Sequence, residues 1–302
     1  SGRTPSLMSL STFPTNEAVT VYTFELPSGL DIGVVRDAVP LLRATTGNEY
    51  IDVRKVANTP GSVEIHAAKE SPFPALAPYP FGTNSGHTIP LGVKADGTVA
   101  ALDFLDGPHT LFLGASGGGK SVALQGVLSG LIHRGDRVVL IDPVKSGVDF
   151  TCFKDHCVAF GDETTPFQAA AIMRKIYDEV LERKEMLRKE GVGFYADLAD
   201  PPCRIAIVVD EFTSLMAFED VGPKTDDPMA AAERSRREVN NAARAQISAY
   251  LGKVAREARF VGVSIFLATQ SLKADTVAKL PGGSDIKDNM SRVGLGKMSQ
   301  GF

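Results

Sequence analysis

Gly114-Ala115-Ser116-Gly117-Gly118-Gly119-Lys120-Ser121 is a glycine-rich stretch that ends in a cation and a hydroxyl. A short apolar run, residues 110–113, comes directly before it. Residues 122–133, directly after it, carry apolar side chains at helical spacing. A strand, a glycine loop and a helix in this order are typical of a phosphate-binding P-loop. With the motif complete and both flanks correct, a glycine turn that merely precedes a lysine is a poor alternative.

Each type of residue in this loop is suited to one part of ATP. Glycines let successive backbone N–H groups turn inward toward phosphates, and the start of the following helix adds its dipole. Lys120 supplies a catalytic cation for the outer phosphates, and Ser121 offers its hydroxyl to Mg²⁺. The predicted ATP-binding residues are Gly114, Ala115, Ser116, Gly117, Gly118, Gly119, Lys120 and Ser121.

Two adjacent acids follow the apolar run at residues 205–209. This run predicts a buried strand beside the P-loop strand. Asp210 at its end can hold Mg²⁺ together with Ser121, and Glu211 can polarise the attacking water, which favours hydrolysis over passive binding. A strand that ends in Asp-Glu is commonplace by itself, and the complete P-loop upstream is what makes the functional interpretation strong.

Three further polar residues stand near strand ends. Gln270 follows the predicted strand at 265–269 and is a candidate catalytic residue that senses the γ-phosphate or orients water; a strand-end cap is the alternative. Asp142 follows another strand, and a second carboxylate at a strand end suggests a role in the site. A turn-forming Asp-Pro explains this residue equally well. His109 is either a packing residue or a residue at the edge of the site.

Strands alternate with helices through residues 89–302, which predicts a RecA-like P-loop α/β domain with a mostly parallel sheet flanked by helices. Within it, residues 168–190 and 248–260 are predicted helices, and residues 263–268 a strand. Residues 89–103 predict a hairpin, because an Asp-Gly turn separates two apolar runs.

The rest of the chain divides into three parts. Residues 1–18 are polar and predict a flexible start. Residues 19–70 predict a small α/β subdomain with three short strands and a helix interrupted near Pro40, and the proline-rich residues 71–88 predict a linker.

Bulk properties exclude several classes. Hydrophobic residues make up 43% of the 302 residues, as in an ordinary globular protein. The net charge of -4 argues against a histone-like protein that binds nucleic acid with its whole surface. No run approaches the roughly 20 apolar residues of a membrane span. The three cysteines lack a second ligand cluster for zinc. The sequence has no Asn-Lys-x-Asp run of a guanine pocket, and no arginine-rich lid of a small-molecule kinase.

Taken in order, several short segments resemble the motor region of the FtsK/SpoIIIE family of DNA translocases. The resemblance implies a RecA-like ATPase that uses ATP and Mg²⁺, assembles as a homo-hexameric ring and pumps double-stranded DNA. It also implies that Arg292 acts catalytically on a neighbour's nucleotide, with an ordinary surface salt bridge as the alternative. The matching pieces are residues 19–29, 89–92, Ile141-Asp142-Pro143, Val209-Asp210-Glu211-Phe212, 267–270 and Ser291-Arg292-Val293.

The sequence departs from the family in three respects, one of which is that residues 89–302 are expected to lack the last strands of the motor. Residues 219–247 are longer than usual, and Ser-Leu-Lys follows Gln270 where the family has Arg-Pro-Ser. The FtsK-like ATPases of type VII protein secretion share this motor and remain the alternative function. A nucleotide-binding assembly module with little turnover is a weaker one, because Glu211 argues for hydrolysis.

The expected location is the cytoplasm, at the inner face of the membrane if regions outside this chain anchor it. Those regions would also supply a winged-helix module. Local basic residues should contact DNA in an acidic chain, and Lys273 and Lys279 are the candidates.

Overall fold

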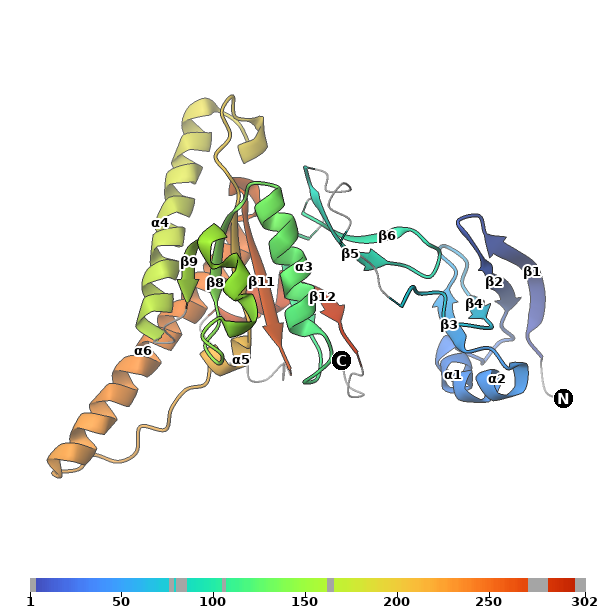
Figure 1. Cartoon of the computed structure of the whole chain (residues 1–302), viewed down its shortest axis with the longest axis horizontal. Helices are drawn as coiled ribbons and strands as arrows, with labels where there is room; N and C mark the ends of the chain where they lie inside the picture. Colours follow the sequence, from blue (N-terminus) through green and yellow to red (C-terminus); the bar gives the residue numbers. More distant parts are fainter. Residues whose placement is uncertain are drawn as a thin grey trace. The chain divides into compact units, whose positions relative to one another are not determined.

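The computed structural model describes residues 4–75, 79, 86–104, 107–161, 166–270 and 282–296. The chain divides into two compact units (Figure 1). One comprises Ser1–Tyr79 with Leu91–Ala101, and the other Pro80–Pro90 with Leu102–Phe302. Within the described residues, no helix combines the length and the apolar character that a membrane crossing requires.

The small unit contains a four-stranded antiparallel sheet in the order β1-β2-β4-β3. Val21, Val53 and Val63 are buried, while neighbouring positions on these strands are more exposed, as a half-covered sheet requires. Its elements are β1 (Ser6–Phe13), β2 (Asn16–Glu25), α1 (Ile32–Asp37), α2 (Val39–Thr46), β3 (Tyr50–Lys55) and β4 (Ser62–Ala68).

Strand β1 corrects the prediction of a flexible start. Its side chains are exposed except at Phe13, which is half-buried, so the strand is held chiefly by backbone pairing with β2. Side-chain patterns carry little trace of such pairing. The predicted break near Pro40 is confirmed, because α1 ends at Asp37 and Pro40 lies in the first turn of α2.

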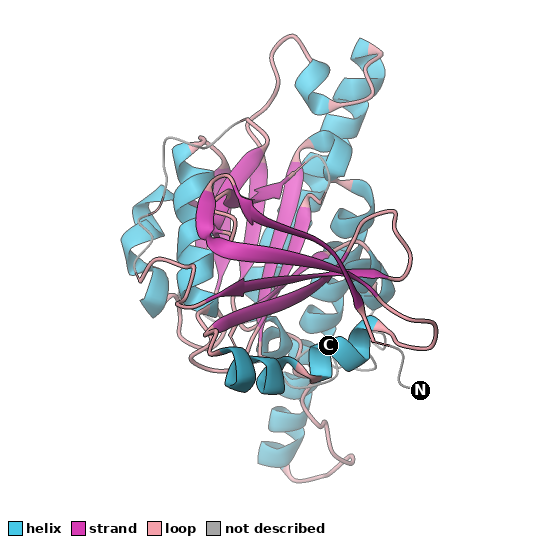
Figure 2. Ribbon diagram, turned by 90° about the vertical axis from the view of Figure 1, so that its right-hand side faces the viewer, coloured by secondary structure: helices cyan, strands magenta, loops and turns pink. Residues whose placement is uncertain are grey.

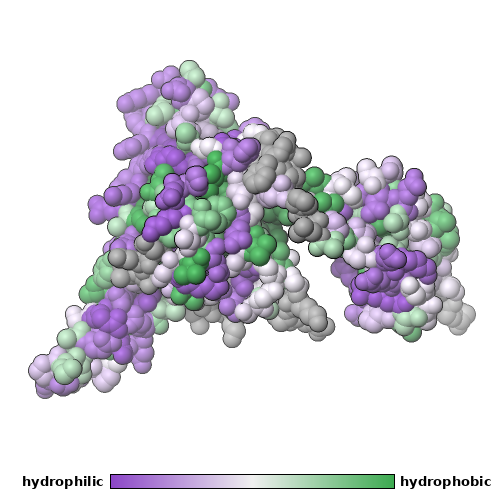
Figure 3. Space-filling model, viewed as in Figure 1, coloured by the Kyte–Doolittle hydropathy of each residue, from purple (hydrophilic) through white to green (hydrophobic). Residues whose placement is uncertain are grey.

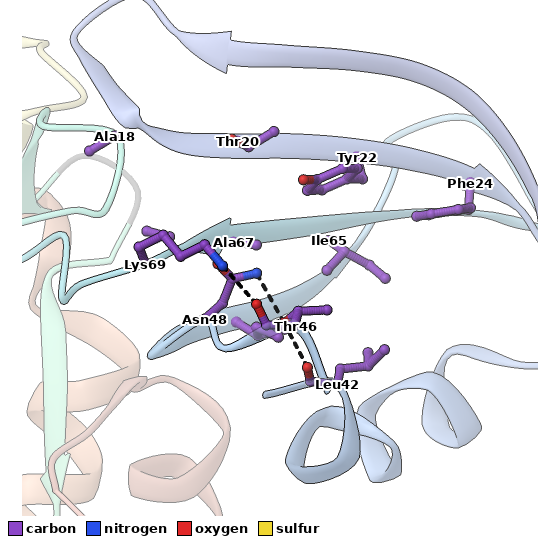
Figure 4. Close-up of a pocket in the computed structure, with 12 residues that line it drawn as sticks. Ala18, Thr20, Tyr22, Phe24, Leu42, Thr46, Asn48, Ile65, Ala67 and Lys69 are labelled. Atoms are coloured by element: carbon purple, nitrogen blue, oxygen red, sulfur yellow. Dashed lines mark hydrogen bonds between the residues drawn. The ribbon is translucent and has the colours of Figure 1, made fainter. Parts of the chain in front are cut away.

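A groove of about 400 Å³ lies on the small unit between β2, β4 and α2. Tyr22, Phe24 and Ile65 line it, and the Lys69 ammonium donates to the carbonyl oxygen of Thr46 at 2.7 Å (Figure 4). None of the predicted site residues lines this groove.

Strands β5 (Thr88–Val93) and β6 (Val99–Asp103) form the predicted hairpin. At its turn the Lys94 N–H donates to the Thr98 carbonyl oxygen at 2.8 Å. Gly97 has φ of +81°, a left-handed conformation that glycine adopts without strain.

The large unit contains a six-stranded sheet in the order β12-β7-β11-β10-β8-β9, and every neighbouring pair is parallel. The predicted parallel sheet flanked by helices is therefore confirmed. Its strands are β7 (His109–Leu113), β8 (Arg137–Ile141), β9 (Cys157–Gly161), β10 (Ile205–Val209), β11 (Val263–Thr269) and β12 (Ser291–Gly294).

Helices cover both faces of this sheet (Figures 1 and 2). Helix α3 (Lys120–His133) lies on one face, and α4 (Pro166–Glu190) and α6 (Pro228–Glu257) lie on the other. Strands β7, β10 and β11 are buried along their whole length, as expected for central strands of a doubly covered sheet.

Two predictions about this unit were wrong. Strand β10 is not beside β7, because β11 lies between them. Helix α6 begins at Pro228, capped by the Asp227 carboxylate, and not near residue 248. None of the residues in its first half is buried, so this half lacks the buried apolar stripe on which helix prediction depends.

The first half of α6 is held by hydrogen bonds to the loop at Glu219 and Asp220, and not by burial in a hydrophobic core. The Glu219 carboxylate accepts hydrogen bonds from Asn240 at 3.0 Å and Arg244 at 2.8 Å. The Arg237 guanidinium donates to the carbonyl oxygen of Asp220 at 2.9 Å. This end of α6 extends beyond the sheet and its surface is largely hydrophilic (Figures 1 and 3).

Candidate nucleotide site

The glycine loop joins β7 to α3 at the carboxyl edge of the parallel sheet. Gly117 and Gly119 have φ of +73° and +93°, left-handed values at which a side chain would be strained. The Gly118 N–H donates to the carbonyl oxygen of Ala115 at 3.0 Å, which closes a tight turn. Helix α3 then begins at Lys120, so its N-terminus faces the loop.

Lys120 is buried and spans the loop. Its ammonium donates to the carbonyl oxygens of Gly114 at 2.9 Å and Ala115 at 3.2 Å. It also lies 3.9 Å from a carboxylate oxygen of Glu211. The structure therefore brings together the cation of the P-loop and the second acid after β10. Ser121 follows in the first turn of α3 and is half-buried.

Asp210 and Asp142 are both buried, at 3% and 1% exposed. Burial raises the pKa of Asp210 to about 6, and the charges of Asp142 and Glu211 contribute in the same direction. The Glu211 N–H, which donates to Asp210 at 3.0 Å, opposes this change in pKa. Repulsion among these acids is relieved by a cation, so the donor set fits a metal ion.

Oxygen donors such as Asp210 and Ser121 suit Mg²⁺, which takes one or two protein ligands and completes its shell with water and phosphate oxygens. The described part of the chain holds no group of three or more His, Cys, Asp or Glu side chains that could bind a metal by themselves.

Asp142 shapes a turn. Its carboxylate accepts hydrogen bonds from the backbone N–H groups of Val144, Lys145 and Gly147 at 3.0–3.1 Å. Of the two alternatives that the sequence allows, this geometry favours the turn-forming Asp-Pro.

Glu211 lies in a strained turn between β10 and the short helix α5 (Phe212–Leu215). Its φ of +50° is uncommon for a residue with a side chain, and such conformations concentrate at functional sites. The Gln270 side-chain amide donates to the Glu211 carboxylate at 3.0 Å. Gln270 thus contacts Glu211 from a position just after the end of β11. Strand β11 lies between β7, which leads into the P-loop, and β10, which leads into Glu211.

Arg292 lies on the edge strand β12, in register with Leu111 of β7, and is exposed. Among the described residues, none forms an ion pair with it. Lys273 and Lys279 lie outside the described residues.

His109 is a packing residue at the other end of the sheet. It begins β7, whereas the P-loop follows the end of β7. Its Nδ1 accepts a hydrogen bond from the Ile265 N–H at 3.1 Å, and burial lowers its pKa to about 4. The neutral imidazole therefore joins β7 to β11.

Sequence reasoning missed the segment that backs the P-loop. The Leu295 N–H donates to the Leu113 carbonyl oxygen at 2.7 Å. A Cβ added to Gly114 would lie 2.6 Å from the Leu295 carbonyl oxygen, and one added to Gly296 would lie 3.0 Å from the Gly118 Cα. Two loop glycines are thus required by close packing as well as by phosphate binding. Gly296 is the one signal of this contact in the sequence.

A parallel sheet with a P-loop, a buried Asp-Glu pair and a polar strand end at its carboxyl edge defines a P-loop ATPase domain. The model of the FtsK/SpoIIIE family matches residues 76–274, and the chain belongs to this family.

Curated relatives include the DNA translocase FtsK of Streptococcus pneumoniae, 29% identical over 212 residues. That of Lactococcus lactis subsp. cremoris is 27% identical over 199 residues. In both cases the match covers 64% of this chain and 24% of the relative, so the chain spans about a quarter of their length.

Two solved structures have a similar fold. One is the pCW3 conjugation coupling protein TcpA, a monomer form with ATPγS, at a TM-score of 0.62 and 22% identity. That match covers 97% of this chain and 77% of TcpA. The other is the cytoplasmic domain of the type VII secretion ATPase EccC from Thermomonospora curvata, at a TM-score of 0.50 and 22% identity, covering 73% of this chain and 24% of EccC.

Proposed function

We propose that this chain is the motor of an ATP-driven translocase that moves double-stranded DNA. The observation that carries the ATPase half is the convergence of Lys120, Glu211 and Gln270 at one edge of the sheet, with the acid 3.9 Å from the lysine and 3.0 Å from the amide. A passive nucleotide-binding module does not need a strained glutamate beside its phosphate-binding lysine.

Each residue has one task in this proposal. Backbone N–H groups of residues 114–119 and the Lys120 ammonium bind the phosphates of ATP, and Ser121 and Asp210 hold Mg²⁺. Bound Mg²⁺ supplies charge neutralisation at the outer phosphates. Glu211 orients the attacking water and accepts its proton, and Gln270 holds the Glu211 carboxylate where it can do so.

DNA as the moved polymer is supported by the relatives, which are named DNA translocases, and by the conjugation coupling protein. The likeness to TcpA covers nearly the whole chain, the small unit included, whereas that to EccC covers about three quarters. Chromosome segregation and conjugative transfer are both compatible with this function. A type VII secretion ATPase is the second candidate, on the strength of the EccC fold.

We further propose that the motor works as a homo-hexameric ring in the cytoplasm, with a membrane anchor supplied by regions outside this chain. In such a ring Arg292 reaches the nucleotide of the next subunit. Its exposure on an edge strand suits a residue that acts outside its own subunit.

The test is the ATPase rate of the full chain with and without long duplex DNA. We expect duplex DNA to stimulate hydrolysis, with a stimulation that falls as salt rises, because phosphate contacts release counterions. Single-stranded DNA of equal nucleotide content serves as the control. If ATP hydrolysis responds to neither duplex nor single-stranded DNA, the chain remains an ATPase but DNA is not the polymer that it moves.

A further inference from the structure

We infer that Thr213 and Thr269 are positioning residues that hold Glu211 at a fixed distance from the P-loop. This inference rests on the proposed ATPase function and adds two residues to it. Their side-chain hydroxyls lie 2.8 Å apart and form a hydrogen bond in which either can donate.

The hydroxyl bond is one of two that join the end of β11 to the turn at Glu211. Thr269 is the last residue of β11 and bonds to Thr213, the second residue of α5. Gln270 comes next and bonds to the Glu211 carboxylate at 3.0 Å. Two consecutive residues of one element therefore hold two residues of the other, which fixes the turn in orientation as well as in distance.

Thr269 also holds the other half of the site. Its carbonyl oxygen accepts the N–H of Gly114, the first residue of the P-loop, at 3.4 Å. This double contact is possible because β11 lies between β7 and β10. One fully buried threonine thus contacts the phosphate-binding loop through its main chain and the Glu211 turn through its side chain.

Glu211 needs such support because of its backbone. At φ of +50° a residue with a side chain is strained, and strain of this kind persists only where the surrounding structure over-determines the conformation. Without the hydroxyl bond the turn can relax and carry the Glu211 carboxylate away from Lys120. A displacement of about 1 Å at a reacting group can cost about 10²-fold in rate.

Replacing Thr213 by valine removes the hydroxyl at nearly constant shape. We expect Thr213→Val to lower kcat about tenfold while KM for ATP and the affinity for ATPγS stay within about twofold, because every P-loop residue remains. Thr213→Ser should recover most of the rate. The matched control is Thr110→Val in β7, whose buried hydroxyl has no hydrogen-bond partner among the described residues. It should turn over as the wild type does.

A double-mutant cycle separates positioning from stability. Each single valine removes the hydrogen bond between the side chains of Thr213 and Thr269, so both should lower Tm. In Thr213→Val/Thr269→Val both sides of this contact are apolar, so part of the stability should recover while kcat stays low. If a single variant does not fold, the double variant still reports kcat.

Recovery of kcat together with stability in the double variant would overturn the inference, and so would a Thr213→Val rate equal to that of Thr110→Val. Failure of the underlying function looks different: wild type itself would then hydrolyse no more ATP than Lys120→Ala.

Discussion

At the scale of single residues, the site separates binding from chemistry. Lys120 belongs to the loop, where its ammonium bonds to two loop carbonyls, and Glu211 belongs to a turn after β10. Among the described residues, the two are joined by the 3.9 Å approach between their charged groups and by the shared neighbour β11. Substitutions should therefore affect binding and hydrolysis independently.

We expect Lys120→Ala to lose nucleotide binding and to lower turnover by about 10²-fold or more, since the principal cation for the phosphates is gone. Glu211→Gln should keep nucleotide affinity near wild type and lower hydrolysis by about 10²- to 10⁴-fold, since an amide accepts no proton from water. Fluorescent-nucleotide titration and phosphate release measure the two quantities. Equal loss of affinity in both variants would contradict this division.

At the scale of elements, His109 links β7 to β11 at the edge of the sheet opposite the P-loop. Burial lowers its pKa to about 4, against a smaller opposing contribution from the backbone of Ala255. The unfolded chain therefore takes up this proton first as pH falls. We therefore expect the free energy of unfolding to fall by about 3 kcal/mol between about pH 6.5 and 4, because a difference of 1 between the two pKa values corresponds to roughly 1.4 kcal/mol.

His109→Asn keeps an acceptor for the Ile265 N–H but does not titrate in this range. We expect its free energy of unfolding, measured by urea at pH 7.5, 5.5 and 4.5, to fall less steeply than that of the wild type. His156→Asn, at an exposed position, controls for the change of residue type. If the free energy of unfolding of His109→Asn falls with pH as steeply as that of the wild type, the acid sensitivity belongs to other groups.

Elements that bury an apolar pattern could be predicted from the sequence, and those held by backbone or charge could not. Strand β11 lies within one residue of the predicted range 263–268, because its apolar run is buried beneath helices. Strand β1 and the first half of α6 leave no such pattern, because backbone pairing holds one and the Glu219 contacts hold the other.

The same rule applies to the site. Local motifs point to Lys120, Asp210, Glu211 and Gln270. Lys120 ends a glycine loop, and the other three come at the ends of apolar runs. The contacts between these motifs depend on strand order, which no local pattern encodes. The insertion of β11 between β7 and β10, and with it the place of Thr269, could come only from the fold.

At the scale of the whole molecule, the ring proposal makes Arg292 a residue of the neighbour's site. Arg292→Ala should then assemble and bind ATP but lose about 10³- to 10⁵-fold in hydrolysis. Mixed with Glu211→Gln, it should regain part of the rate, because some interfaces pair an intact Glu211 with an intact Arg292. Phosphate release from the mixture measures this.

The mixing experiment needs evidence of mixed rings, which co-purification through a tag on one variant provides. With mixed rings present and the rate no higher than in the separate variants, Arg292 would be assigned to its own subunit or to the surface.

The backing of the P-loop by Leu295 and Gly296 has a consequence for biosynthesis. A chain made from its N-terminus releases the loop from the ribosome long before these two residues appear. The Leu113 carbonyl then lacks its partner from Leu295, and Gly114 and Gly118 lack the backbone that packs against them. We therefore expect the nascent chain to bind ATP only after translation has passed Gly296. ATP binding would then wait until β12 has paired with β7.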